Sequence, residues 1–100
     1  MNGLSLLKCI CEETRFNILE ILQKNGELSV SELVNRLGRD QPLISHHLKA
    51  LKQCKIVGSK DKGKSTFYFI QNKEISKLID DITKAGEKMA TVCNDPMCAC

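Results

Sequence analysis

The sequence predicts a mainly α-helical fold with one β-hairpin, built as a single domain of 100 residues. Apolar residues recur at helical spacing through the first half of the chain and again after residue 72. Near residue 54 the pattern changes to short β-branched and aromatic runs separated by a basic turn. Two short helices precede this hairpin. That order is typical of a winged helix-turn-helix.

The first apolar segment, residues 4–22, is expected to form two helices. Thr14 and Arg15 interrupt its apolar periodicity, so we expect a break near Cys11–Thr14. Asn25 and Gly26 are expected to end the second helix, because both residue types tolerate the left-handed conformation found at helix ends.

The next two helices have recognisable end signals. Ser29 and Glu32 have the spacing of a capping box, and Gly38 is expected to end the helix that follows them. The second of the pair is expected over Asp40–Gln53. Asp40 is its cap, and Pro42 lies in the first turn, where a missing N–H costs nothing. Its apolar stripe consists of Leu43, Ile44, Leu48 and Leu51.

The hairpin and a last helix complete the expected order. Ile56–Val57 and Phe67–Ile70 are the expected strands, and the basic stretch Ser59–Lys64 is the turn, with Gly63 able to adopt a positive φ. Asn72 is expected to cap the last helix. The apolar face of that helix would carry Ile75, Leu78, Ile79, Ile82 and Met89.

Domain organisation and location follow from the same reading. We expect residues 1–92 to form the folded and dimerising domain, and 93–100 to form a cysteine-rich tail after Asn94–Pro96 ends the last helix. No apolar run reaches the roughly 18 residues that a membrane span needs. The N-terminus lacks the pattern of a signal peptide, so a cytoplasmic protein with reduced cysteines is expected.

Positive charge is concentrated in one quarter of the chain. The net charge is +3, but residues 41–64 carry six lysines and one acid, a local +5, so the remainder sums to −2. Such a concentration favours a nucleic-acid partner, although a solvated lysine face is the alternative. No nucleophile–base pair and no glycine-rich phosphate loop is present, so we do not expect an enzyme or an organic cofactor.

Three stretches resemble the ArsR/SmtB family of metal-sensing repressors. Residues 6–19 (LLKCICEETRFNIL) and 27–33 (ELSVSEL) are similar to two family patterns. Residues 41–51 (QPLISHHLKAL) nearly reproduce a third, QptiSHHLkxL, which is the most specific. The resemblance covers roughly residues 4–90. It implies a homodimer that binds double-stranded operator DNA as a repressor.

The expected DNA contacts combine side-chain chemistry with this resemblance. Gln41, Ser45 and Lys49 project from one side of their helix, and Gln and Ser can bond base edges. The resemblance implies base or backbone contact for Gln41, Ser45 and His46, whereas His47 is expected at the boundary between helix and core. The expected phosphate contacts are Lys49, Lys52, Lys60, Lys62 and Lys64.

The resemblance also directs attention to inducer sites, two of which are absent here. Ser29 and Ser31 occupy the positions of a common cysteine site, and residues 72–88 contain no histidine for a zinc-type site. Thiols remain, with three of the six cysteines clustered in the tail. Thiolates suit soft ions, here As(III) or Sb(III), or Cd(II) or Pb(II). The candidate ligands in the tail are Cys93, Cys98 and Cys100.

The other three cysteines are distributed differently. Cys54 follows the expected DNA-reading helix, and in a cadmium- and lead-sensing branch of the family a cysteine there pairs with C-terminal cysteines of the other subunit. Its companion in that branch is Ala50 here, and Lys55 replaces a family glycine, so Lys55 must adopt a different turn or bear strain. Cys54 remains a candidate metal ligand that could join Cys98 or Cys100 across the dimer, Cys11 is a less favoured candidate, and Cys9 is expected to face the core.

Two signals are compatible with this reading. The first and last helices are expected to form the dimer, and an ion bound by thiolates near the last helix would shift the spacing of the two DNA-reading helices. Alternatively, the cysteines form a disulfide or polysulfide, which would make the chain a repressor that responds to redox state or sulfide.

Overall fold

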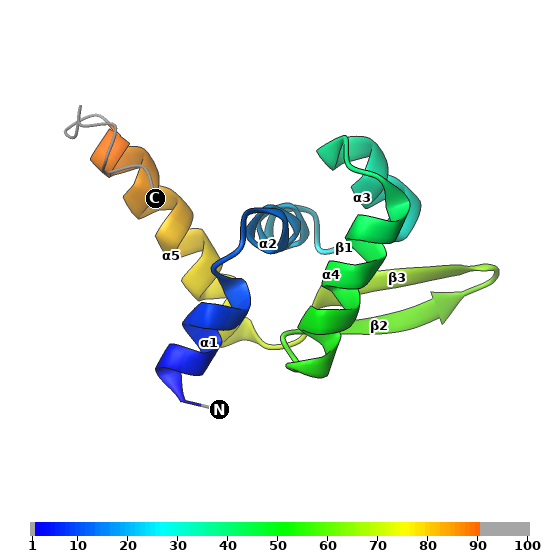
Figure 1. The fold of residues 1–100 in the computed structure, drawn as a ribbon, viewed down its shortest axis with the longest axis horizontal. Helices are drawn as coiled ribbons and strands as arrows, with labels where there is room; N and C mark the ends of the chain where they lie inside the picture. The colour runs from blue at the N-terminus through cyan, green and yellow to red at the C-terminus, as the bar shows by residue number, and fades with distance from the viewer. Residues whose placement is uncertain (1, 91–100) are drawn as a thin grey trace.

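The computed structural model describes residues 2–90, and the tail cysteines Cys93, Cys98 and Cys100 lie outside them. In this part of the chain five helices pack with a small antiparallel sheet of strand order β1-β3-β2, and the β2–β3 hairpin projects away from the helices (Figure 1). The elements are α1 (Gly3–Ile10), α2 (Glu13–Asn25), β1 (Glu27–Ser29), α3 (Val30–Leu37), α4 (Gln41–Gln53), β2 (Val57–Lys62), β3 (Ser65–Ile70) and α5 (Lys73–Ala90). The predicted winged helix-turn-helix order is confirmed.

The first two helices are separated by the predicted break, which falls at Cys11 and Glu12. Asn2 caps α1 by accepting a hydrogen bond from the Ser5 N–H at 2.8 Å. Glu12 caps α2 in the same way, because its Oε2 accepts from the Arg15 N–H at 2.9 Å. Each of the two helices therefore begins with its own side-chain cap.

The predicted helix-turn-helix consists of α3 and α4. The capping box is present, since Ser29 Oγ accepts from the Glu32 N–H and Glu32 Oε1 accepts from the Ser29 N–H. Gly38 ends α3 in the left-handed conformation, with φ 66°. Asp40 occupies the cap position of α4 without a side-chain hydrogen bond, and Pro42 lies in the first turn.

The sheet contains one strand more than the hairpin that we expected from the sequence. The three residues of β1 pair with Phe67–Phe69 of β3, on the edge opposite β2. A run this short is below the length at which alternation identifies a strand. Gly63 takes φ 65° at the turn between β2 and β3, as predicted, but the expected turn Ser59–Lys64 was too long, because β2 extends through Lys62 and pairs with β3 over that stretch.

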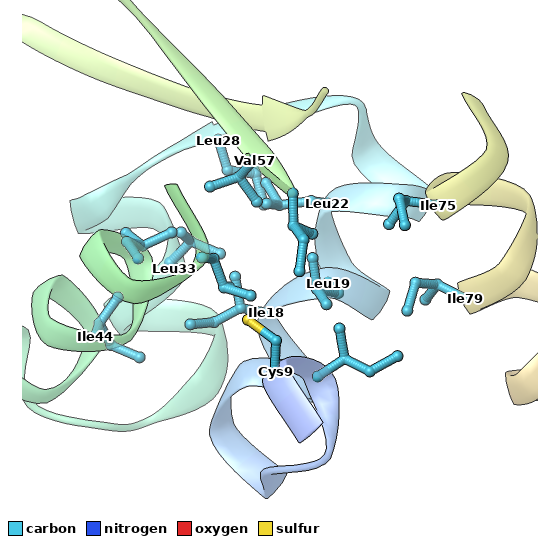
Figure 2. Packing of buried hydrophobic residues seen from close by; sticks show 14 residues of the cluster. Cys9, Ile18, Leu19, Leu22, Leu28, Leu33, Ile44, Val57, Ile75 and Ile79 are labelled. Carbon is cyan, nitrogen blue, oxygen red and sulfur yellow. The ribbon is translucent and has the colours of Figure 1, made fainter. Parts of the chain in front are cut away.

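The core lies among the end of α1, α2, α3, α4, the sheet and the first half of α5 (Figure 2). Burial of apolar area is the main force that holds these elements together. Ile44, Leu48 and Leu51 turn one face of α4 into this core, and each is at most 1% exposed. The opposite face of α4 is consequently left to solvent. Other fully buried side chains are those of Ile18, Leu19, Leu22, Leu33, Val57 and Ile79.

The last helix, α5, is only partly covered. Asn72 caps it as predicted, accepting from the Ile75 N–H at 2.8 Å, and Ile75 and Ile79 are buried. Met89 is 59% exposed, and in α1 Leu4 and Leu7 are 61% and 52% exposed. The helices in residues 2–90 lack the combination of length and hydropathy that a transmembrane helix requires.

Candidate nucleic-acid interface

The solvent-facing side of α4 carries the polar residues expected to contact DNA. Gln41, Ser45 and Lys49 are all exposed and follow one another at intervals of four residues, so they lie along one face of the helix. His46 is exposed beside them. The face therefore offers an amide, a hydroxyl, an imidazole and an ammonium group, which are groups that bond base edges and phosphates.

The two adjacent histidines of α4 have different environments. His46 is exposed, whereas His47 is only 8% exposed, as expected for a residue at the boundary between helix and core. Their rings meet edge to face, with centroids 5.3 Å apart. His47 therefore belongs to the internal structure of the domain, and His46 to its surface.

His47 joins α4 to the start of α2 through a polar network that the sequence did not reveal. Arg15 Nε donates to His47 Nδ1 at 3.1 Å, and His47 Nε2 lies 3.6 Å from Glu12 Oε2. Because Nδ1 accepts this bond, the ring proton of neutral His47 resides on Nε2 and faces Glu12. The pKa of His47 is lowered mainly by burial, and the attraction of Glu12 opposes this shift.

The carboxylate of Glu12 is held ionised within this network. Burial acts to raise its pKa, but hydrogen bonds from the backbone N–H groups of Arg15 and Thr14 act to lower it, and the net shift is downward. The nearby charges of His47 and Arg15 act in the same direction. Glu12 thus caps α2 and also faces His47 of α4, so it links the start of α2 to α4.

The wing, β2 and β3 with their turn, carries lysines that are partly engaged within the chain. Lys60 Nζ lies 2.7 Å from Glu27 Oε2, and Lys62 Nζ pairs with the other oxygen of the same carboxylate. These two lysines hold the pKa of Glu27 below its usual value. The ammonium groups also lie over aromatic rings, Lys60 at 5.7 Å from the centroid of Phe69 and Lys62 at 5.3 Å from that of Phe67.

The remaining candidate lysines are less constrained. Lys52 donates to Ser59 Oγ at 2.6 Å, which ties the end of α4 to the start of the wing. Lys49 and Lys64 are exposed, and among residues 2–90 neither is recorded in an ion pair. The pairing of Lys60 and Lys62 was missed because it depends on β1, which places Glu27 in the sheet beside them.

The structure brings together two cysteines that lie 45 positions apart in the sequence. Cys9 Sγ donates to Cys54 Sγ at 2.8 Å, and Cys9 is buried whereas Cys54 is half-buried. Burial, together with the contact to Cys54, raises the pKa of Cys9 to about 11. Cys11 is exposed at the break between α1 and α2. Within residues 2–90 no three potential ligands cluster around one point.

A helix-turn-helix with an exposed polar face on its second helix, followed by a cationic hairpin, defines the class of winged-helix DNA-binding proteins. More narrowly, the chain belongs to the family described as "Bacterial regulatory protein, arsR family", whose pattern matches residues 12–59. It is thus a DNA-binding transcriptional regulator of that family, and nothing in the family points to catalysis.

Individual relatives support this assignment. An HTH-type transcriptional regulator of Methanocaldococcus jannaschii is 39% identical over 80 residues, which are 77% of this chain and 90% of that protein. The arsenic resistance transcriptional regulator ArsR1 of Pseudomonas putida is 32% identical over 79% of this chain, which spans only 61% of that relative. The solved structure of HlyU from Vibrio cholerae is 32% identical, with a TM-score of 0.76 over 85% of this chain and 97% of that one.

Proposed function

We propose that this chain is a homodimeric repressor that leaves double-stranded operator DNA when its cysteine thiolates bind a soft metal or metalloid ion. The observation that carries the DNA-binding part is the exposed polar face of α4, with its opposite face anchored in the core. Gln41, Ser45 and His46 are the proposed base-reading residues. The proposed phosphate contacts are Lys49, Lys52, Lys60, Lys62 and Lys64.

Exposed apolar side chains support the dimer. Leu4 and Leu7 of α1 and Met89 of α5 are each more than half exposed, and covering them against a second copy would remove apolar area from water. Figure 1 shows α5 at the opposite end of the molecule from the wing tip, so contacts through α5 leave the wing accessible. Two copies related by a two-fold axis would present two α4 helices to successive major grooves.

The inducer is proposed from donor chemistry. Cys54 and the tail residues Cys93, Cys98 and Cys100 are the proposed ligands, with Cys11 as a further candidate, and thiolates prefer soft ions such as As(III), Sb(III), Cd(II) or Pb(II). The ArsR1 relative is named for arsenic resistance, which supports a metalloid within this group. A bound ion at the C-cap of α4 would act on the helix that reads DNA.

The test is a binding titration of the reduced chain on the DNA upstream of its own coding sequence, read by fluorescence anisotropy. Arsenite, Cd(II), Pb(II) and Zn(II) are added in turn. We expect tight binding that arsenite, Cd(II) or Pb(II) reverses, and no release by Zn(II). The matched control is the Cys93→Ser/Cys98→Ser/Cys100→Ser variant, which should bind DNA equally well and resist release. An unchanged inducer response in that variant would exclude the tail as the site.

A redox signal is the second candidate, and the contact between Cys9 and Cys54 favours it. Release by an oxidant, reversal by a reductant and indifference to all four metals would identify this mode.

A further inference from the structure

Cys9 and Cys54 form a close pair of thiols at the junction of two helices. Cys9 lies in the last turn of α1, and Cys54 is the C-cap residue of α4. Their sulfur atoms are 2.8 Å apart, about 0.8 Å more than the disulfide bond length of roughly 2.05 Å. The two sulfur atoms are therefore close enough to make this pair the candidate for a disulfide within residues 2–90.

The two thiols of this pair differ in access. Cys9 is buried, with only 8% of its surface exposed. Cys54 is half-buried and lines a hollow of about 290 Å³, together with Leu6 and Ile75. A small reagent can therefore reach Cys54 from solvent more readily than it can reach Cys9.

We propose that Cys9 and Cys54 are a disulfide-forming site that reacts with low-molecular-weight disulfides such as oxidised glutathione. The thiolate of Cys54 attacks one sulfur of the reagent, forming a mixed disulfide and releasing one glutathione thiolate. Cys9 gives its proton to solvent and attacks the Cys54 sulfur, which releases the second glutathione. The protein loses two electrons and two protons, and the reagent is reduced to two thiols.

The site is placed to act on α4. Immediately after Cys54, Lys55 takes φ 62°, a left-handed conformation that is strained for a residue with a side chain. The chain there is held by two backbone hydrogen bonds of 3.0 Å, from Lys55 N to the Lys52 carbonyl and from Ile56 N to the Leu51 carbonyl. A covalent bond at Cys54 pulls on this strained end of α4 and ties it to α1.

The effect on DNA, unlike the bond itself, rests on the proposed function. The α1 helix carries the exposed Leu4 and Leu7 proposed for the dimer, so the bond connects that surface to the DNA-reading helix. Couplings of this kind change affinity roughly fivefold to 150-fold. We expect operator affinity of the disulfide form to be lower by a factor in this range.

The test isolates the pair in the full chain. The variant Cys11→Ser/Cys93→Ser/Cys98→Ser/Cys100→Ser keeps only Cys9 and Cys54. After treatment with oxidised glutathione, we expect intact mass to fall by two hydrogen atoms, both thiols to be lost to titration, and two glutathione molecules to be released per chain. A matched variant that also carries Cys54→Ser should keep a titratable Cys9. A stable glutathione adduct, or two thiols that remain titratable, would overturn the proposal.

The unmodified chain provides a second readout that needs no substitution. Peptide mapping without reductant should recover the peptides of Cys9 and Cys54 linked to each other, whereas a link from Cys54 to a tail cysteine instead would overturn the proposal. DNA binding is measured separately on the reduced and oxidised forms. If the disulfide forms but neither the reduced nor the oxidised protein binds DNA, the proposed function is wrong, whereas the disulfide site between Cys9 and Cys54 is still supported.

Discussion

The exposed face of α4 and the wing both carry polar and cationic side chains, but these side chains differ in whether they are already paired within the chain. On α4, Gln41 and Lys49 point to solvent, held there by the buried residues on the opposite face. On the wing, Lys60 and Lys62 are already paired with Glu27. Lysines that look equivalent in the sequence therefore differ in their availability to bind a phosphate, because some of them are already paired with a carboxylate.

Loss of base reading on α4 is expected to have the largest effect. Gln41→Ala removes an amide that can make two hydrogen bonds to an adenine, which is worth roughly 1–3 kcal/mol of discrimination between base pairs. Affinity for a duplex selected by the protein from a random pool should fall accordingly, and affinity for a scrambled duplex should not. Gln53→Ala, at the exposed far end of the same helix, is the control. Equal losses on both duplexes would contradict base reading by Gln41.

The free and the paired lysines should differ in their contribution to salt dependence. Each phosphate contact contributes a slope of about −0.9 to the plot of log affinity against log salt. We expect Lys64→Ala to remove most of one such unit, because its charge is not shared in the described part of the chain. Lys60→Ala should remove less, since Glu27 already offsets that charge. Anisotropy titrations from low to high salt measure both slopes. A larger reduction of the slope in Lys60→Ala than in Lys64→Ala would contradict this expectation.

Removing the Glu27 carboxylate should leave the wing lysines as free to bind phosphate as the exposed lysine of α4. In Glu27→Gln the two lysines lose their carboxylate, so we expect affinity for random-sequence DNA to rise severalfold at low salt. Glu74→Gln, an exposed position at the start of α5, changes net charge by the same amount and is the control. If both variants gain equally, net charge alone accounts for the gain.

The smallest effect is expected from pH, on the buried side of α4. The pKa of His47 lies below its usual value of 6.5, so the unfolded chain takes up a proton first as pH falls. The free energy of unfolding should therefore decrease as pH drops below 6.5, and decrease again below 4.5 as Glu12 is protonated. Urea titrations across this range measure it. His46→Gln should keep the first step and His47→Gln should remove it; persistence of that step in His47→Gln would refute this assignment.

The helices and the presence of the wing could be predicted because local signals determine them, but the first wing strand extends through Lys62, into the stretch expected to be the turn. The capping box at Ser29 and the left-handed Gly38 and Gly63 appear in the structure where the sequence indicates them. The strand β1 could not be predicted, since three residues show no period and their pairing with Phe67–Phe69 depends on the tertiary fold.

The candidate site could be predicted only in part, for the same reason. Exposure of Gln41 and burial of His47 follow from helical spacing on α4. The pairing of Glu27 with the wing lysines and the contact of Cys9 with Cys54 join residues far apart in sequence. Lys55 shows how far the fold overrides local preference, because it takes the left-handed conformation of the glycine it replaces.

The central claim is that α4 and the wing tip form the DNA-binding surface. Its most direct test is an amide NMR map of the full chain titrated with the selected duplex. We predict the largest shifts at residues 41–49 and 60–64, with small shifts over residues 73–90. Large shifts confined to α5, or none at all at saturating DNA, would contradict the account.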